Sequence, residues 1–581
     1  MYTLGINAVY HDSSACLVCN GEVVAAAEDE RFTHVKHGKR PVPFSTWELP
    51  FHAIDYCLAE AGIALRDVDR IAYSYDPALL GAWSAETTIA LPLQPSAQRH
   101  AGGHESPWDP LFISYVVNAP RQLVSGAPLH LQARLAGVDL DWVEPRWRFL
   151  EHHLAHEASA FLAAPFDEMA VLSMDGRGER ATTSFGHYAN GEYRRLRQVD
   201  LPHSLGLVYE DVTRYLGFLH SSDEYKVMAL ASFGEPRYAD AFREIIRSGP
   251  DGSYEVHPSR LVERFGPARQ RGAPLDARHY DIARSLQLVL EETVLDMARW
   301  LHAETGCPHL AMAGGVALNC VMNARVRDLG PFEGVWVQPA AGDAGTALGS
   351  ALWIDHTERP GAGRGRTYVM EHAYLGPSFD DDEIGAFLKW SKLPYRRLGD
   401  PAGETADLLA KNRIIGWFQG RMEFGPRALG ARSILASPID PGMQARLNEI
   451  KDREDFRPVA PVVMEERAAD WFHCARPSGF IAPYMLFVFD VIEGKAEQIP
   501  AVCHIDGTAR VQTVGRRQNP LYYDLLAAFE RRTGVPILVN TSFNTRGEPI
   551  VCTPRDAIEC FWTSPLDALV IGSYLLEKAP S

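Results

Sequence analysis

Three histidines fall close together in the stretch EHHLAHEASA, residues 151–160. At positions i and i+4 of a helix, His152 and His156 would project from one face and could bind one metal ion, whereas His153 would point elsewhere. Asp175 follows the next apolar strand, at the end where α/β folds place ligands, and Asp343 lies in the turn GDAG. Two imidazoles and two carboxylates suit iron, zinc or manganese, with positions left for phosphate oxygens. The alternative is an ordinary helix with hydrogen-bonded histidines.

A polar turn after the first strand carries a second set of candidate groups, His11, Asp12 and Ser14. Such a turn can equally be plain surface. Its position, however, corresponds to that of the phosphate-contacting turn in ATPases that are built from two duplicated lobes. His11 could also act as a base towards a hydroxyl acceptor, because an imidazole titrates near neutral pH.

Cationic and hydroxyl side chains recur in apolar surroundings in the second half of the chain. They occur in RMEFGPRALGARS (421–433), NEIKDREDFRPVAP (448–461), IDGTARVQTV (505–514) and ILVNTSFNTRGEP (537–549). Single arginines usually belong to a solvated surface. Arg427, Lys451 and Arg457 instead flank apolar or proline-terminated segments, so this set could cradle a compact phosphate.

The elements that must position these groups are repeated. Strands are expected at residues 2–8, 15–19 and 22–27, with Asn20-Gly21 as a hairpin turn, and again at 169–174 and 182–188 before Asn190-Gly191. The repeated order of strand, polar turn and hairpin predicts an internal duplication. This is the layout of the actin and sugar-kinase type of ATPase, in which a nucleotide lies between two related lobes.

Two glycine-rich turns follow, in HLAMAGGVALN (309–319) and QPAAGDAGTALGSAL (338–352). Glycines let the backbone approach a ligand, and the helix after each turn directs its N-terminal amides at an anion. Two such turns downstream of the duplicated hairpins favour a nucleotide site.

A segment rich in glycine, proline and arginine, DHTERPGAGRGRTY, follows Ile354 and predicts a domain boundary. We expect one domain at residues 1–357 and a second, mixed α/β domain at 368–581. The second contains apolar strands at 413–418, 485–491 and 536–539. Residues 80–147 lack periodicity but contain aromatic residues, which favours a helical insertion or lid.

The bulk composition bounds the function. The chain has 581 residues, 46% of them hydrophobic, and a net charge of -17. Its length predicts about three to four domains or lobes. The charge argues against nucleic acid as a partner, and the sequence has no secretory leader or apolar membrane span, so we expect a cytoplasmic protein. Nine scattered cysteines, including Cys16 and Cys19 in a strand, do not resemble a disulfide framework.

The motifs HHLAHEASA, SMDGRGE, GGVALNC, GDAGTALGSA, FGPRALGARSILA, KDREDFRPVAP and VNTSFNTRGEPIV together resemble the O-carbamoyltransferases of the NodU/CmcH family. They span nearly the whole chain in the family's order, and only residues 80–147 lie outside them. The resemblance implies an N-terminal duplicated, actin-like (ASKHA-type) α/β domain and a C-terminal YrdC-like α/β domain.

The resemblance also implies a reaction. Carbamoyl phosphate and ATP, with Mg(II), would form carbamoyladenylate in the C-terminal domain, and a hydroxyl of an acceptor would then take the carbamoyl group in the N-terminal domain. There a divalent metal, usually Fe(II), would hold the phosphate. By position in the family motifs, the metal ligands would be His152, His156, Asp175 and Asp343. The nucleotide, carbamoyl phosphate and catalytic residues would be His11, Glu224, Lys226, Gly314, Gly315, Asn319, Arg427, Lys451, Arg457, Arg510, Asn540, Thr541 and Ser542.

One segment departs from the family pattern. Where a glycine-rich GEGKVMGLA-like stretch is expected, the chain has SDEYKVMALASFG, with Tyr225 and Ala229 in place of glycines. The acceptor is expected to be a small-molecule hydroxyl compound, such as an antibiotic or another natural product, and the protein a homodimer. Two alternatives stay open: a sugar-kinase-like phosphotransferase and a tRNA threonylcarbamoylation-type protein.

Overall fold

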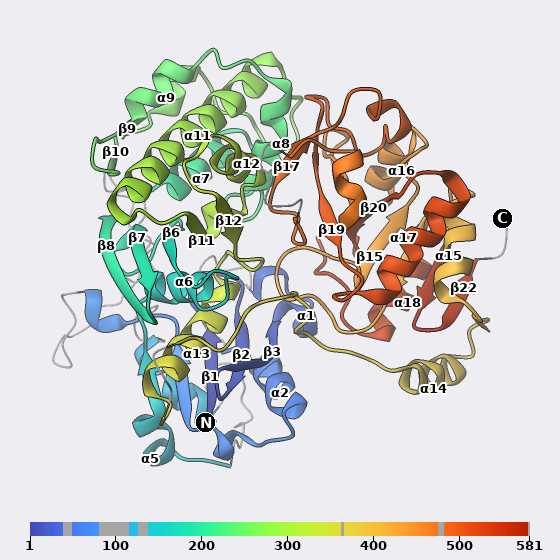
Figure 1. Cartoon of the computed structure of the whole chain (residues 1–581), viewed down its shortest axis with the longest axis horizontal. Helices are drawn as coiled ribbons and strands as arrows, with labels where there is room; N and C mark the ends of the chain where they lie inside the picture. Colours follow the sequence, from blue (N-terminus) through green and yellow to red (C-terminus); the bar gives the residue numbers. More distant parts are fainter. Residues whose placement is uncertain are drawn as a thin grey trace.

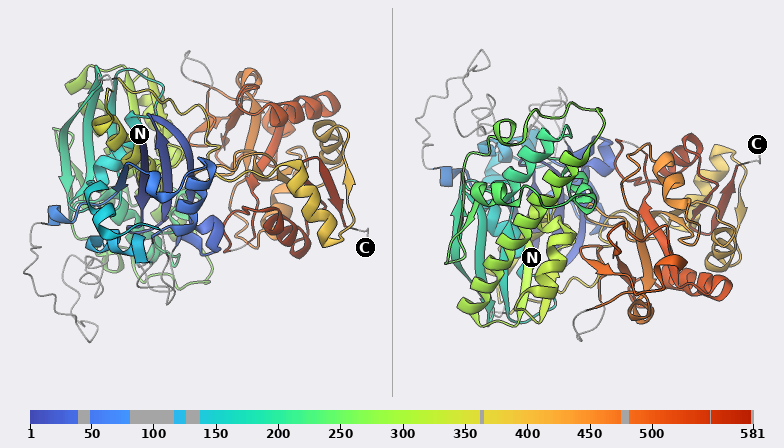
Figure 2. Two further views of the ribbon diagram at one scale, coloured as in Figure 1. Left: turned by 90° about the horizontal axis from the view of Figure 1, so that it is seen from below. Right: turned by 90° about the horizontal axis from the view of Figure 1, so that it is seen from above.

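A computed structural model describes residues 1–38, 49–80, 116–125, 137–361, 365–474, 481–545 and 547–578. The chain forms two bodies that lie side by side in all three views (Figures 1 and 2). The larger one runs to the end of helix α13, Ala344–Glu358; the next segment stays against it, where Met370 and Leu375 hydrogen-bond to Ala163 and Ala26, and the smaller body follows. Within the described part, no helix is long and apolar enough to cross a membrane. All nine cysteines are free thiols.

The N-terminal domain contains two sheets of the same topology, so the predicted duplication is confirmed. In each sheet three consecutive strands form an antiparallel meander, and two later strands add in parallel beside the first. The first sheet, in the order β3-β2-β1-β4-β5, comprises β1 Tyr2–Asn7, β2 Ser14–Cys19, β3 Glu22–Glu28, β4 Arg70–Tyr73 and β5 Trp147–Phe149. The second, in the order β12-β11-β6-β7-β8, comprises β6 Met169–Met174, β7 Ala181–Ala189, β8 Glu192–Asp200, β11 His309–Ala313 and β12 Gly334–Val337.

Two helices pack between these sheets and hold the lobes together. Helix α6, His152–Phe161, packs on β6, β7 and β11, and α13 packs on β1, β2 and α6. Glycines permit this close approach: a Cβ on Gly349 would lie 1.8 Å from the carbonyl oxygen of Ala155, and one on Gly5 would lie 1.9 Å from that of Ala347. Because α6 packs on the second sheet and α13 on the first, the contact between the two helices joins the two lobes.

Helix α2, Phe51–Glu60, packs on the first sheet, and further helices cover the second, of which α11 is the longest (Figure 1). A buried apolar face holds α11 to its neighbours, and Asp276 caps its first turn by accepting from the backbone N–H of His279. The helices of the second lobe are α7 Leu205–Tyr215, α8 Glu224–Leu230, α9 Ala239–Ile245, α10 Leu261–Phe265, α11 Ala277–Thr305 and α12 Cys320–Leu329; the two-stranded ribbon is β9 Ile246–Ser248 and β10 Tyr254–Val256.

The C-terminal domain is built on a mixed sheet of eight strands in the order β13-β22-β21-β14-β15-β20-β16-β19. Its strands are β13 Arg396–Arg397, β14 Ile415–Phe418, β15 Arg432–Ala436, β16 Ala460–Met464, β19 Gln512–Val514, β20 Ile537–Ser542, β21 Ala568–Ile571 and β22 Tyr574–Glu577, with a separate pair β17 Val488–Asp490 and β18 Thr508–Arg510. Its helices are α14 Asp381–Ser391, α15 Pro401–Leu409, α16 Met443–Ile450, α17 Pro520–Thr533 and α18 Pro554–Thr563.

One strand prediction in this domain needs correction. The stretch expected as a strand at 485–491 is extended only over β17, and Met485 has a φ of +57°. The apolar run is buried by packing against other segments and does not extend the ladder. The strands expected near 413–418 and 536–539 are present as β14 and β20.

The two domains are joined by buried polar contacts as well as by the chain itself. Arg31 pairs with Glu28 at 3.0 Å and donates to the backbone oxygen of Gly425, whose N–H donates to Glu28 at 2.8 Å. Farther along the interface, the Asn323 side chain donates to the backbone oxygen of Leu486 at 3.0 Å. Peptide groups of one domain are thus held by side chains of the other.

Of the insertion expected at residues 80–147, the structure describes only 116–125 and 137–147 with residue 80. These form the short helices α4 Ala119–Ser125 and α5 Leu140–Val143 and the start of β5. Trp83, Trp108 and Phe112 lie outside the described residues.

Candidate active sites

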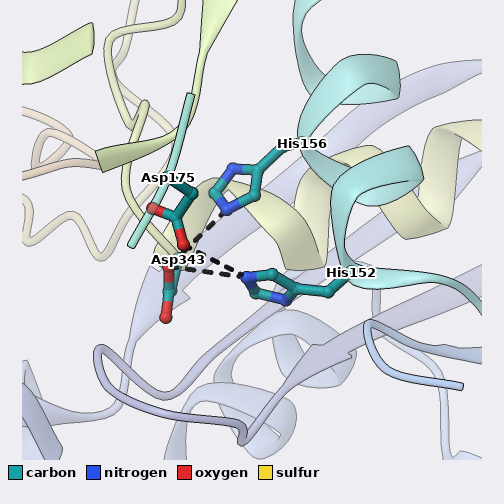
Figure 3. Close-up of side chains that lie close together, drawn as sticks. All are labelled: His152, His156, Asp175 and Asp343. Carbon is teal, nitrogen blue, oxygen red and sulfur yellow. Dashed lines mark ion pairs between the residues drawn. The ribbon is translucent and has the colours of Figure 1, made fainter. Parts of the chain in front are cut away.

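Four predicted metal ligands meet at the junction of the two lobes. His152 and His156 come from the first two turns of α6, Asp175 follows β6, and Asp343 immediately precedes α13 (Figure 3). Nε2 of His152 lies 3.8 Å from Asp175 and 3.7 Å from Asp343, and Nε2 of His156 lies 3.6 Å from Asp343. Adjacent ligand atoms around a tetrahedral ion with bonds of about 2.1 Å stand about 3.4 Å apart, so the spacing fits one metal ion.

The hydrogen bonds around these side chains leave lone pairs for a metal. Nδ1 of His152 faces the backbone oxygen of Ser74 at 3.1 Å, so Nδ1 carries the proton and Nε2 is free to bind. Nε2 of His152, both ring nitrogens of His156 and Oδ1 of Asp343 are buried with no hydrogen-bond partner. Buried polar atoms without partners are costly. A cation at the centre of the four would satisfy Nε2 of each histidine and Oδ1 of Asp343.

The electrostatics of the site favour ionised carboxylates. Burial alone would raise the pKa of Asp343, but His11, His152 and His156 outweigh it and hold that pKa at about 2. Burial also opposes ionisation of Asp175, whose pKa is nevertheless held well below its usual range by His152 and His156. The carboxylates are therefore ready to bind a cation at neutral pH.

Glu179 positions the helix that carries both histidines. Its carboxylate accepts the backbone N–H of His152 at 3.0 Å and that of Asp76 at 2.6 Å. The preceding Glu151 provides no side-chain cap for α6, so Glu179 supplies the cap from a distant turn. Sequence reasoning did not single out this residue, although it is the last residue of the quoted motif SMDGRGE.

His11 lies beside this candidate centre. Its Nε2 is 3.8 Å from Asp343, and its Nδ1 is 2.9 Å from Asp12. The other oxygen of Asp12 contacts Nδ1 of His37 at 2.8 Å, and Nε2 of His37 contacts Ser222 at 3.0 Å. Asp12 thus orients His11, and His37 connects the first lobe to the second.

The predicted nucleotide turn reaches the candidate metal centre. The N–H of Gly315 donates to Asp175 at 2.7 Å. Gly314 has a φ of +89°, and a Cβ there would lie 2.1 Å from the oxygen of Met174, so only glycine fits. Asn319 caps α12. Glu224, half-buried near His11, has its pKa raised to about 7 by partial burial and by Glu210.

A second candidate site, which we call the basic site, lies in the C-terminal domain where the predicted cationic side chains gather. Nζ of Lys451 is buried and donates to the Ser542 hydroxyl at 3.1 Å and to the Asn544 side-chain oxygen at 2.7 Å. Nε of Arg427 and Nε of Arg510 are buried without a partner. Among the described residues, no carboxylate pairs with Lys451, Arg427 or Arg510. The site therefore presents uncompensated positive charge.

The same excess of positive charge shifts the pKa values of these side chains. Burial lowers the pKa of Lys451 well below its usual range, and Arg453 and Arg457 lower it further. Burial and the neighbouring Arg510 lower the pKa of Arg427. A bound phosphate would relieve this repulsion, because the protonated cations gain a counter-charge.

The remaining predicted residues take different positions. Asn540 is buried and donates to Gln512 at 2.7 Å while its own side-chain oxygen has no partner. Thr541 follows it in β20, opposite Ile434. Lys226 is held in an ion pair, with Nζ 2.8 Å from Glu454 of the other domain.

Comparison with known proteins covers both domains. Residues 2–352 match the family model "Carbamoyltransferase N-terminus", and residues 406–578 match "Carbamoyltransferase C-terminus". The chain belongs to the carbamoyltransferase family.

Relatives confirm the NodU/CmcH type of carbamoyltransferase. Nodulation protein NolNO of Sinorhizobium fredii is 38% identical over 98% of this chain and 80% of its own. Nodulation protein NolO of Bradyrhizobium diazoefficiens is 42% identical over 74% of this chain and 79% of its own, and nodulation protein U of Sinorhizobium fredii is 30% identical over 95% of both. Among solved structures, component A of Acidaminococcus fermentans (R)-2-hydroxyglutaryl-CoA dehydratase covers 61% of this chain and 97% of its own, at 16% identity and a TM-score of 0.32.

The carbamoyltransferase also places in its basic site two residues that sequence reasoning missed. Nε of Arg453 donates to Asn448 at 2.6 Å, and its guanidinium lies among the other cations, with its pKa lowered by burial and by Arg457. Asn544 accepts from Lys451. Arg453 and Asn544 lie inside the quoted motifs KDREDFRPVAP and VNTSFNTRGEPIV. Nothing in the sequence around them distinguishes them from surface residues.

Proposed function

We propose that this carbamoyltransferase is ATP-dependent and works in two steps, with carbamoyladenylate as the intermediate. The first step takes place in the basic site around Lys451, and the second at the metal centre beside His11. The acceptor is a hydroxyl group of a small molecule. The actin-like and YrdC-like assignments of the two domains, and the boundary between 357 and 368, are part of this proposal.

One observation carries the proposal: an uncompensated cation cluster and a candidate metal centre flank the same short helix. Glu224, the first residue of α8, lies close enough to His11 for the imidazole to lower its pKa against the effect of burial. The next residue, Tyr225, has its ring 4.6 Å from the guanidinium carbon of Arg457. A product formed at one site is therefore close to the other.

The first step matches the charge of the basic site. Water cleaves carbamoyl phosphate to phosphate and carbamate, and a carbamate oxygen then attacks the α-phosphorus of ATP, with pyrophosphate as the leaving group. Lys451, Arg427, Arg457 and Arg510 would offset the negative charge on the phosphoryl oxygens, with Mg(II) bound to the nucleotide. Asn540 and Ser542 would orient the reactants from the end of β20.

The second step uses the N-terminal site. The acceptor hydroxyl gives its proton to Nε2 of His11, its oxygen bonds to the carbamoyl carbon, and AMP leaves. Asp12 holds the ring of His11 in place for this transfer. His152, His156, Asp175 and Asp343 would hold a divalent ion, proposed to be Fe(II), which supplies a Lewis acid for the phosphate of the intermediate. Gly314, Gly315 and Asn319 leave room for the nucleotide.

The test follows products with and without an acceptor. Protein incubated with ATP and carbamoyl phosphate alone should release pyrophosphate, and a chelator of the transition metal should spare this release while Mg(II) is in excess. Lys451→Ala should abolish it. Lys495→Ala, a matched lysine above Trp471 in the same domain, should not. His156→Ala should keep pyrophosphate release and lose carbamoyl transfer. Absence of pyrophosphate from the wild-type protein would contradict the proposed intermediate.

Acceptor, partners and location are part of the same proposal. We propose a natural-product acceptor chosen with help from residues 80–147, a homodimeric cytoplasmic enzyme, and no nucleic-acid or membrane partner. A sugar-kinase-like phosphotransferase would yield ADP in place of AMP, and a tRNA-directed protein would retain tRNA on a filter. Neither alternative accounts for the basic site.

A further inference from the structure

Tyr225 stands where the family pattern has a glycine, and its ring reaches into the other domain. The guanidinium carbon of Arg457 lies 4.6 Å from the centre of that ring. The neighbouring Lys226 pairs with Glu454 at 2.8 Å and with Asp223 at 3.1 Å. The first turn of α8 is thereby fastened to residues 454–457 of the C-terminal domain.

Arg457 has few other fixed partners. Its guanidinium approaches one carboxylate, Glu454, at 3.7 Å, which is longer than a hydrogen bond. Its side chain is 22% exposed. A guanidinium with one distant ion pair has rotational freedom unless a flat surface holds it, and an aromatic face provides such a surface.

The position of Arg457 matters to the whole basic site. Its charge lowers the pKa of each of the other four cations there, Arg427, Lys451, Arg453 and Arg510. Arg457 therefore lies within electrostatic reach of all of them. Moving its guanidinium would change the field at a bound phosphate.

We propose that Tyr225 of the N-terminal domain is a positioning residue for the anion site of the C-terminal domain. Its ring holds the guanidinium of Arg457 in the orientation that binds carbamoyl phosphate. This inference rests on the proposed function for its kinetic test. With glycine at this position, the guanidinium would lose its support. The tyrosine couples the first step of the reaction to the presence of the other domain.

The kinetic experiment uses the full chain and measures pyrophosphate release without an acceptor. Tyr225→Leu keeps bulk but removes the aromatic face, and should raise KM for carbamoyl phosphate about fivefold to twentyfold with kcat within about threefold. Tyr225→Phe keeps the face and should stay within about twofold. Tyr523→Leu is the matched control, because Arg516 lies 4.4 Å above that ring on the surface of the C-terminal domain.

Binding of inorganic pyrophosphate, measured by calorimetry, separates this inference from the proposed reaction. Tyr225→Leu should weaken binding by the same fivefold to twentyfold, even if the wild-type protein forms no adenylate. In an Arg457→Ala background, the same substitution should change nothing further. The inference is overturned if Tyr225→Leu binds as the wild type does, if Tyr225→Phe is equally impaired, if the effect persists without Arg457, or if the wild type binds no pyrophosphate.

Discussion

The candidate metal centre depends on a glycine at the contact between α13 and α6. Gly349 of α13 faces α6, and a Cβ there would lie 1.8 Å from the oxygen of Ala155 and 2.7 Å from the N of Ser159. Gly349→Ala forces the helices apart by at least about 1.2 Å, the difference from the 3.0 Å that real Cβ contacts require. Both contacts are backbone atoms of the helix that carries His152 and His156.

The size of the effect follows from the ligand spacing. His156 and Asp343 stand 3.6 Å apart across the site, and a further shift of about 1.2 Å would bring them to about 4.8 Å. Two ligands on one ion at about 2.1 Å can be no more than about 4.2 Å apart. At least one ligand is then lost. We expect metal affinity to fall tenfold or more, with about 1–3 kcal/mol of stability lost to overpacking.

Titration of metal-free protein with Fe(II) under anaerobic conditions, or with Co(II) followed by its absorbance, measures the affinity. Gly385→Ala is the matched control, because a Cβ in that helix meets the end of one flexible side chain, the Tyr574 hydroxyl at 2.4 Å. Pyrophosphate release should survive in both variants. Binding of the metal by Gly349→Ala within about twofold of wild type would refute this account of the site.

Three further predictions concern carboxylates. Glu179→Ala should lower the melting temperature, cost about 1–3 kcal/mol and weaken metal binding, because the N–H of His152 loses its acceptor; Glu179→Gln should recover part of both. Burial raises the pKa of Glu224 to about 7, so stabilisation by its protonated form is complete below about pH 4.5 and lost as the pH rises through 7. Between pH 5 and 8, the free energy of unfolding of the wild type, measured in urea, should fall by on the order of 1–3 kcal/mol relative to that of Glu224→Gln. The same pH dependence in both proteins would contradict this prediction. Arg31→Met should cost about 3–5 kcal/mol in urea unfolding, since the Glu28 carboxylate is left buried without its counter-charge, and adding Glu28→Gln should restore part of the loss.

Local patterns in the sequence predicted the elements well. The duplicated hairpins appear as β1-β2-β3 and β6-β7-β8, because alternating apolar residues around Asn-Gly turns are short-range signals. The helical spacing of His152 and His156 likewise follows from the helix period. The strand expected at 485–491 was wrong at its start, where residues 485–487 are irregular, since an apolar run is compatible with burial in an irregular segment.

Other features depended on contacts between distant segments. Glu179 and Asn544 act on partners far along the chain, and no local rule marks them. Lys226 was expected at the nucleotide, but its Nζ lies in an ion pair with Glu454 of the other domain. The assignment of Lys226 to the nucleotide stays a prediction, because Glu454 and a nucleotide would compete for the same ammonium group.

The sequence by itself determined the family, the duplicated lobe and the residue types of both sites, because motifs and periodicity are local properties. The tertiary structure alone decided how those residues meet. Asp343 joins His152 because small residues let α13 approach α6, and Tyr225 supports Arg457 because the two domains pack there. Each of these contacts forms only when large surfaces of the folded chain pack together. No short segment of the sequence supplies the free energy of that packing.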